Sequence, residues 1–359
     1  MKKRKIAAAL TGGCVLLWGA AALWPEKQFQ TQITPDETPE RTPEKMKQEA
    51  GPRGETMTRG AISENHEHSE LSTEPELRLP VEMKTQFAVL SKVYAAELAY
   101  PAYSRPITAQ DKQWLEPNRY MPVKAPVLDG EDSAALVLKK YRHFFPEDIR
   151  LSIQSGLPVA AMTVELFDLQ THQRLTGKKT LENQVVFPSE EHWPDEIRAK
   201  ATVDFSTGTD ILTADFQFFV PVAEVTQVAK PVISGANVEI PVMLTVKKAG
   251  IYRIRANLFT ASGQPVAVLT AKQTLAAGEQ IMTLQAYHQV FAGAGEFELR
   301  TFQVEKMSGF PGEKSQYGIS QQPGWPLGYI DTSLLSDEPY VPTKAEQQRM
   351  NFLESAASG

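Results

Sequence analysis

The chain has 359 residues with a formal net charge of −6, and 42% of its residues are hydrophobic. This is enough for two globular domains, and it excludes a collagen, a coiled coil and a wholly disordered chain, while the mild acidity argues against a general nucleic-acid-binding protein. The single cysteine, Cys14, excludes an intramolecular disulfide and a cysteine-based zinc site.

The first predicted element is a membrane helix at the amino terminus. Residues 6–24 carry no charge, and as a helix they span roughly 28 Å, which is about the thickness of a hydrocarbon core. Residues 2–5 are all basic, so the positive-inside rule places the amino terminus in the cytoplasm and the rest of the chain outside. The pattern predicts a signal anchor over residues 1–25 that crosses a bacterial inner membrane once, with the body in the periplasm.

The same segment allows two other interpretations. Residues 20–22 are all alanine and supply the A-x-A pattern of a signal-peptide cleavage site, which leaves a secreted or periplasmic protein without an anchor. Cys14 is also a candidate for lipid modification, although Thr11 stands where a lipoprotein signal normally has Leu. All three interpretations export the body of the protein.

The next stretch, residues 26–80, is predicted to be a disordered linker. It contains twelve acidic and seven basic side chains, a single aromatic residue, Phe29, and a Thr-Pro step at every fourth position from Thr34 to Pro43. Such a composition cannot bury enough apolar surface to offset the entropy of ordering. A random coil of about 55 residues reaches roughly 40 Å, so the linker acts either as a spacer between membrane and body or as an unspecific stalk.

Residues 81–116 are predicted to form an adaptor helix followed by an extended strap. Phe87, Leu90, Tyr94 and Leu98 recur at spacings of three and four, which places one apolar face on a helix. The prolines that follow end this helix and favour extended backbone. The helix packs on the body or docks a partner, and the strap lies on the surface of a domain or contacts a ligand.

From residue 117 the apolar pattern changes to a period of two. Alternation over residues 211–220 and 251–259 places one face of each strand on a core and the other in water, as in antiparallel sheets. Turn signals such as Ser-Gly and Thr-Gly separate the strands at short intervals. The sequence therefore predicts a mainly β protein with two tandem antiparallel β-sandwiches, over residues 117–220 and 221–308.

The second predicted sandwich has a regular succession of strands. One strand begins at Gly250–Ile254, turns at Ser262 and is followed by further short strands. This segment resembles the immunoglobulin-like or fibronectin-type-III-like modules of bacterial exported proteins, and the resemblance implies a fold and no activity. Residues 309–359 are predicted to be a Pro- and Gly-rich tail that ends in a short helix, which Thr343 and Glu346 cap.

The body carries no spacing typical of a zinc hydrolase, a serine nucleophile elbow or a phosphate-binding loop. Acidic residues around Trp193 can act as acid and base on a sugar that stacks on the ring, or hold calcium. The simpler interpretation is an acidic loop whose Trp covers the core. No cofactor and no metal is predicted. The candidate binding surface comprises six residues: Trp193, Glu190, Glu191, Tyr100, Tyr103 and Trp325.

Three functions are consistent with these features, and the first is favoured. It is a non-catalytic scaffold, tethered to the membrane, that binds an envelope protein. The second is a carbohydrate- or cell-wall-binding module that uses Trp193, Trp325 and the segments rich in Tyr and Pro. The third is a carboxylate-based hydrolase that uses Glu190, Glu191 or Asp195.

Overall fold

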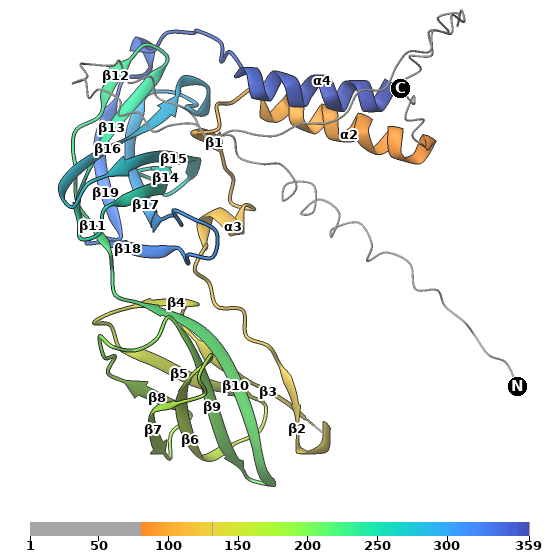
Figure 1. Ribbon diagram of the computed structural model, residues 1–359, viewed down its shortest axis with the longest axis vertical. Helices are drawn as coiled ribbons and strands as arrows, with labels where there is room; N and C mark the ends of the chain where they lie inside the picture. The colour runs from red at the N-terminus through yellow and green to blue at the C-terminus, as the bar shows by residue number, and fades with distance from the viewer. Residues whose placement is uncertain (1–79, 131, 359) are drawn as a thin grey trace, which may run out of the picture. The chain divides into compact units, whose positions relative to one another are not determined.

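The structure is a computed structural model, and it describes residues 80–130 and 132–358 (Figure 1). The predicted anchor, residues 1–25, lies outside the described residues, as does the predicted linker apart from Pro80. No helix in the described part of the chain has both the length and the apolar composition needed to cross a membrane. The prediction of a mainly β protein is confirmed, because most elements of the described chain are strands.

The first sandwich consists of two sheets. One has the strand order β4-β10-β9-β6-β7 and the other the order β2-β3-β5-β8. Neighbouring strands run antiparallel, except that β4 runs parallel to β10. The strands are β2 (Ala125–Val127), β3 (Asp132–Leu138), β4 (Arg142–Phe144), β5 (Ile149–Ser155), β6 (Val159–Asp168), β7 (Arg174–Thr180), β8 (Gln184–Phe187), β9 (Glu196–Phe205) and β10 (Gly208–Phe219).

Alternate side chains of both sheets fill the core of the first sandwich. Strand β9 shows the pattern, because Ile197, Ala199, Ala201 and Val203 are all fully buried while the residues between them are not. β9 pairs with β6 on one side and with β10 on the other, so it is central in its sheet. Burial of a larger aliphatic side chain is worth about 1.5–3 kcal/mol, so this alternation holds the sandwich together.

The second sandwich is built from a larger network of paired strands. Its order is β1-β15-β14-β17-β18-β11-β13-β12, with β16 on β13 and β19 on β17. These strands enclose one continuous core, separate from that of the first sandwich. The strands are β1 (Ser104–Pro106), β11 (Ala223–Val228), β12 (Val232–Ser234), β13 (Asn237–Val246), β14 (Gly250–Thr260), β15 (Pro265–Leu275), β16 (Gly278–Tyr287), β17 (Gly295–Lys306), β18 (Gln316–Ser320) and β19 (Gly324–Ile330).

Two segments that the sequence assigned elsewhere contribute strands to the second sandwich. β1 lies in the predicted strap and pairs antiparallel with β15, where Ser104 is opposite Leu269. β18 and β19 lie in the predicted tail after residue 309, and both pair with β17. β19 accommodates Pro326 because it is an edge strand whose register is irregular beside Glu298. Such pairings join residues that are far apart, which the local Pro and Gly content does not reveal.

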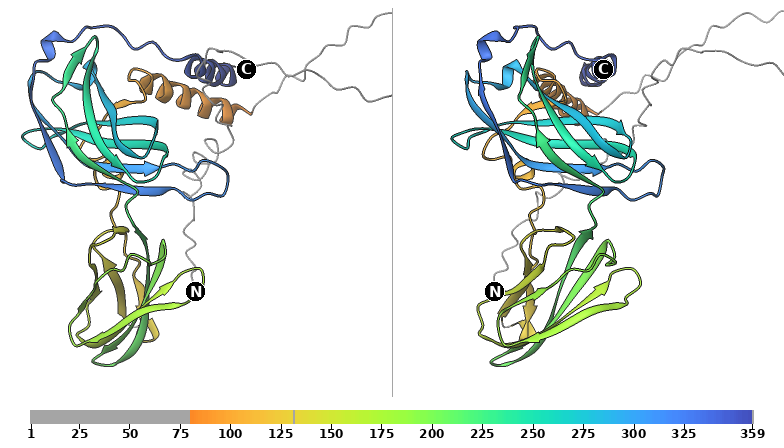
Figure 2. Two further views of the ribbon diagram at one scale, coloured as in Figure 1. Left: turned by 60° about the vertical axis from the view of Figure 1, so that its left-hand side comes forward. Right: turned by 90° about the vertical axis from the view of Figure 1, so that its left-hand side faces the viewer.

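Helices stand near both ends of the described chain. α2 and α4 lie side by side, as the views of Figures 1 and 2 agree, and both belong with the two sandwiches to one compact unit. The helices are α2 (Val81–Glu97), α3 (Lys112–Leu115) and α4 (Lys344–Ser358), and the short 3-10 turns are η1 (Leu128–Gly130), η2 (His288–Val290) and η3 (Thr332–Leu334). The predicted adaptor helix therefore packs on the carboxy-terminal helix.

Tyr252 is a fully buried polar anchor of the second sandwich. Its hydroxyl donates a hydrogen bond to the carbonyl oxygen of Lys248 at 2.6 Å and lies 3.4 Å from the carbonyl oxygen of Val222. Burial raises the pKa of this phenol from 10.0 to about 12. Val222 is in the connection between the sandwiches, so the hydroxyl ties β14 to the point where the chain enters the second sandwich.

Replacing Tyr252 by Phe is expected to lower the free energy of unfolding of the second sandwich by about 1–2 kcal/mol, because the carbonyl oxygen of Lys248 loses its buried donor. The wild type should also lose stability as the pH rises from 10.0 through about 12, because only the unfolded phenol ionises readily. Tyr329→Phe, at a side chain that is 68% exposed, is the matched control. Urea denaturation at neutral and alkaline pH measures both effects, and identical curves for Y252F and the wild type would contradict them.

Candidate functional site

Trp193 is part of the first core and not an exposed platform. Its side chain is 6% exposed, and its ring centre lies 5.5 Å from that of Phe218. Glu190 and Glu191 are exposed on the loop before it, where a carboxylate oxygen of Glu190 lies 3.6 Å from Nε2 of His192. The interpretation of an acidic loop whose Trp covers the core is therefore confirmed, and the ring has no open face on which a sugar can stack.

The other three residues of the predicted surface lie in or beside the second sandwich. Trp325 is 8% exposed, and its indole N–H donates to Oγ of Ser320 at 2.9 Å. Tyr100 packs against the second core, and the hydroxyl of Tyr103 donates to Oδ1 of Asn237 at 2.9 Å. The six predicted residues do not form one surface, because three belong to the first sandwich and three to the second.

A polar hollow lies beside the acidic loop. Asp195, one of the carboxylates predicted for a hydrolase, lines it together with Asp168, Gln170, Glu196 and Lys314. A carboxylate oxygen of Glu196 lies 3.0 Å from Nε2 of Gln170 and 3.0 Å from Nζ of Lys314, and these two partners hold the pKa of the Glu196 carboxyl below its usual value. A carboxylate engaged in this way links the two sandwiches. No group of three or more His, Cys, Asp or Glu side chains among residues 80–130 and 132–358 is arranged to hold a metal ion.

α2 and α4 form an antiparallel pair. Phe87 in the first half of α2 contacts Phe352 in the second half of α4 edge to face, with the ring centres 6.1 Å apart. Further along α2, Tyr94 lies beside Glu346 and Arg349 in the first turns of α4. Each helix therefore supplies the apolar partner of the other, although they come from opposite ends of the described chain.

A hydrogen-bonded cap fixes the start of α4. Oε2 of Glu346 accepts hydrogen bonds from the backbone N–H of Thr343 at 2.7 Å, from Oγ1 of Thr343 at 2.8 Å and from the hydroxyl of Tyr340 at 2.8 Å. Burial raises the pKa of the Glu346 carboxyl, but these donors outweigh burial and hold it below its usual value. The capping box of Thr343 and Glu346 is therefore confirmed.

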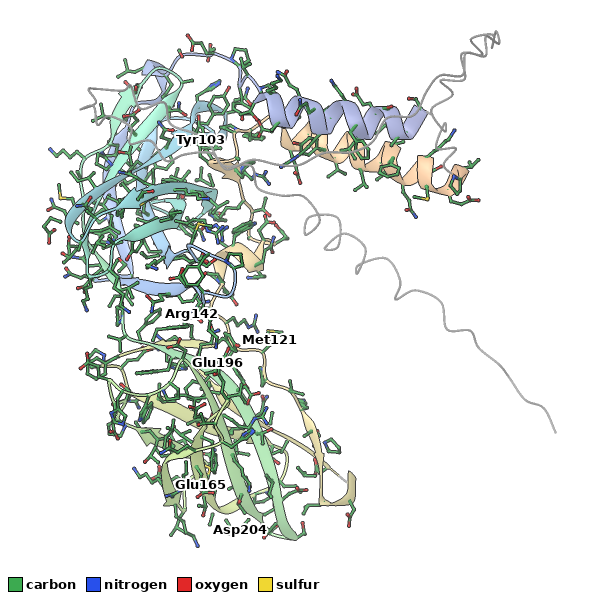
Figure 3. All side chains as sticks on the ribbon, in the orientation of Figure 1. Tyr103, Met121, Arg142, Glu165, Glu196 and Asp204 are labelled. Atoms are coloured by element: carbon green, nitrogen blue, oxygen red, sulfur yellow. The ribbon has the colours of Figure 1, made fainter. Side chains whose placement is uncertain are left out.

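Hydrogen bonds attach the helix pair to the second sandwich at its base. In the segment after α2, Tyr103 bonds to Asn237, and Oγ of Ser104 accepts from the backbone N–H of Tyr287 at 3.0 Å (Figure 3). In the segment before α4, the carbonyl oxygen of Glu338 accepts from the hydroxyl of Tyr287 at 2.7 Å. Tyr287 thus contacts the chain leaving α2 as well as the chain entering α4, so it fixes the end of α2 beside the start of α4.

Three exposed valines lie on the side of α2 away from Phe87, where they alternate with the exposed Glu82, Thr85 and Lys92. Val81, Val89 and Val93 are 73%, 57% and 52% exposed, and at 3.6 residues per turn they lie within one side of the helix. Phe352 of α4 is 51% exposed. The apolar stripe that contains Phe87 is the one the sequence predicts. The spacing of eight and four between the valines is the signal for this second group.

Comparison with known proteins does not identify a family. No family model and no curated protein matches the chain. Among solved structures, a DUF4785 family protein from Legionella pneumophila is similar with a TM-score of 0.40 and 13% identity, over 56% of this chain and 57% of that one. Escherichia coli α2-macroglobulin gives a TM-score of 0.23 at 12% identity, over 60% of this chain and 24% of that one. Salmonella α2-macroglobulin gives 0.22 at 13%, over 54% and 16%. The chain spans less than two thirds of the length of each of these proteins.

Replacing Phe87 by Ala is expected to loosen the helix pair by about 1–2 kcal/mol, because the edge-to-face contact with Phe352 and the apolar area behind it are lost. Val89→Ala, on the opposite side of the same helix, is the matched control. Amide hydrogen exchange of α2 and α4 should rise severalfold in F87A and stay unchanged in V89A. Equal exchange in the two variants would mean that α4 does not hold α2.

Proposed function

We propose that the chain is a non-catalytic scaffold, tethered to a bacterial inner membrane by residues 1–25, whose extracytoplasmic body binds an envelope protein. The observation that carries this proposal is the group of three exposed valines on α2, Val81, Val89 and Val93. α2 is the first described element after the predicted linker, residues 26–80. A partner bound to α2 is therefore held by the element that the tether enters.

The chemistry of this side favours a protein partner with an apolar helix face. Burying a valine is worth about 1.5 kcal/mol, so a contact over three of them contributes a useful part of a binding free energy. α4 occupies the other side of α2, so the three valines are the apolar side chains that α2 offers to a further helix. An amphipathic helix of the partner, laid along the valines, completes a group of three helices.

The two other functions have less support from the described residues. A carbohydrate-binding module needs exposed rings, and Trp193 and Trp325 are only 6% and 8% exposed. A carboxylate hydrolase needs a positioned acid and base, and Glu190 and Glu191 lie on an exposed loop that does not exclude water. Burial raises the pKa of Asp195, which lines the polar hollow, but the carboxylate beside it, Glu196, is already paired with Lys314. We therefore place the function in recognition of a protein.

Replacing Val89 and Val93 together by Glu is expected to abolish binding of the partner, because two charges would have to be buried in an apolar contact. A photo-crosslinker at exposed Thr85, activated in native membranes, should yield a crosslinked protein that V89E/V93E loses. Gln348→Glu, which adds negative charge at an exposed position of α4, is the control and should keep that protein. The same crosslink at full yield in V89E/V93E, with α2 and α4 still paired by hydrogen exchange, would rule out this surface.

The mature chain is expected to keep residues 1–25 and to stay in the membrane fraction after an alkaline carbonate wash, because an uncleaved apolar helix is not extracted. Intact-mass spectrometry of the purified protein measures the first residue directly. A variant with a cleavable signal in place of residues 1–25 is the control and should be released as a soluble protein. A mature mass that begins just after Ala22 would replace the anchor by a signal peptide.

A further inference from the structure

A row of charged and aromatic side chains crosses the outer face of the second sandwich. Arg253 of β14 is opposite Lys272 of β15 on one side and Glu305 of β17 on the other, and Glu305 is opposite Tyr317 of β18. Directly opposed residues of antiparallel strands share a face of the sheet. Ile254, the next residue of β14, is fully buried in the core, so the row lies on the side away from the core.

Arg253 forms an ion pair with Glu305, the carboxylate of this row. Its Nε donates to Oε2 of Glu305 at 3.1 Å, and its Nη2 donates to the same oxygen at 2.5 Å. The other oxygen, Oε1, accepts from Oγ of Ser315 at 3.0 Å. The Glu305 side chain is only 17% exposed. Both of its oxygens are engaged, so it compensates the charge of one guanidinium group.

Arg255 is the next outward residue of β14, and it has no carboxylate within ion-pair distance in the described part of the chain. α3 covers this part of the sheet, because Nδ2 of the buried Asn257 donates to the carbonyl oxygen of Trp114 at 2.7 Å. The guanidinium of Arg255 lies 5.6 Å from the centre of the Trp114 ring. Burial lowers the pKa of Arg255, and the neighbouring Arg253 lowers it further. An aromatic face attracts the cation but leaves its in-plane N–H groups unpaired.

Arg142 of β4, in the first sandwich, is a second guanidinium of this kind (Figure 3). It lies 3.5 Å from the centre of the Tyr317 ring, and its Nε donates to Oε1 of Gln217 at 3.4 Å. The side chain of Asn118 holds its backbone, because Oδ1 accepts from the N–H of Arg142 at 2.6 Å and Nδ2 donates to its carbonyl oxygen at 2.8 Å. Burial lowers the pKa of Arg142, and none of the described carboxylates pairs with it.

We propose that Arg142, Arg253 and Arg255 form an anion site for a ligand that carries a doubly charged oxyanion group, either a phosphate or paired carboxylates. Three guanidinium groups share one carboxylate, which leaves two positive charges in surroundings where an unpaired charge is unfavourable. A guanidinium edge forms two parallel hydrogen bonds with such a group. The rings of Trp114 and Tyr317 hold two of the guanidinium groups while most of their N–H donors stay available.

A purely structural role does not explain this composition. Arg255 stacked on Trp114 also attaches α3 to the second sandwich, and Arg142 stacked on Tyr317 attaches the first sandwich to the second. This attachment needs only the rings and the backbone hydrogen bonds. It does not need positive charge in excess of Glu305. Apolar side chains in place of Arg142 and Arg255 would pack on the same rings without the desolvation that half-buried guanidinium groups suffer.

Isothermal titration of the full chain with inorganic phosphate and with a hexaglutamate peptide, in chloride as reference anion, tests the site. Arg142→Gln and Arg255→Gln are each expected to weaken binding about tenfold. Glu305→Gln is expected to strengthen it severalfold, because it removes the carboxylate that competes with the ligand. Arg198→Gln is the matched control, since Arg198 pairs with Asp215 through two hydrogen bonds elsewhere on the first sandwich, and it should bind like the wild type.

Trp114 supplies a second measurement. Binding should change the tryptophan fluorescence of the wild type and not that of Trp114→Phe, whose backbone carbonyl still accepts from Asn257. If R142Q loosens the first sandwich, Arg142→Lys keeps the charge and should restore part of the affinity. Binding of phosphate alone identifies a free dianion as the ligand, and binding of the peptide alone identifies an acidic protein segment. Binding of neither, or equal binding by R142Q, R255Q and R198Q, overturns the proposal.

Discussion

Alternating burial along the strands keeps two hydrophobic cores apart, and the surfaces of the protein depend on this separation. In β13, Val238, Ile240, Val242 and Leu244 are all fully buried, while the residues between them point outward. Each such side chain contributes about 1.5–3 kcal/mol. Because the strands of each sandwich close its own core, α2 and α4 pack on each other, and the outer face of β14 can carry arginine side chains.

The sequence was informative wherever a pattern is local. The period of two predicted the sandwiches, and the spacing of Phe87 and Tyr94 predicted a helix. The partner of that helix could not be predicted, because α4 has only a thin apolar stripe and is far from α2 in the sequence. β1, β18 and β19 were missed for a related reason. Their strands are short or interrupted by Pro and Gly, and only pairing with β15 and β17 makes them strands.

The candidate site was less predictable than the fold. Whether a polar or aromatic side chain is exposed for binding depends on which distant parts of the chain cover it. Trp193 stands in an acidic loop and Trp325 among prolines, and both contexts are typical of surface. In the structure Trp193 reaches Phe218, and the indole N–H of Trp325 finds a partner in Ser320, so both rings are buried. The row of charged and aromatic side chains around Arg253 was equally hidden, since only the register of four strands brings its members together.

The segment between α2 and the first sandwich determines both proposed surfaces. Its first part pairs as β1 with β15 and, through Tyr103 and Ser104, secures the base of the helix pair. Its middle part places Trp114 over Arg255, and its last part, at Asn118, fixes the backbone of Arg142. The contacts of Ser104 and Asn118 are hydrogen bonds to backbone groups, and those of Tyr103 and Trp114 join half-buried side chains. The segment is therefore a structural element in its own right, because it positions the end of α2 and completes the cluster of guanidinium groups.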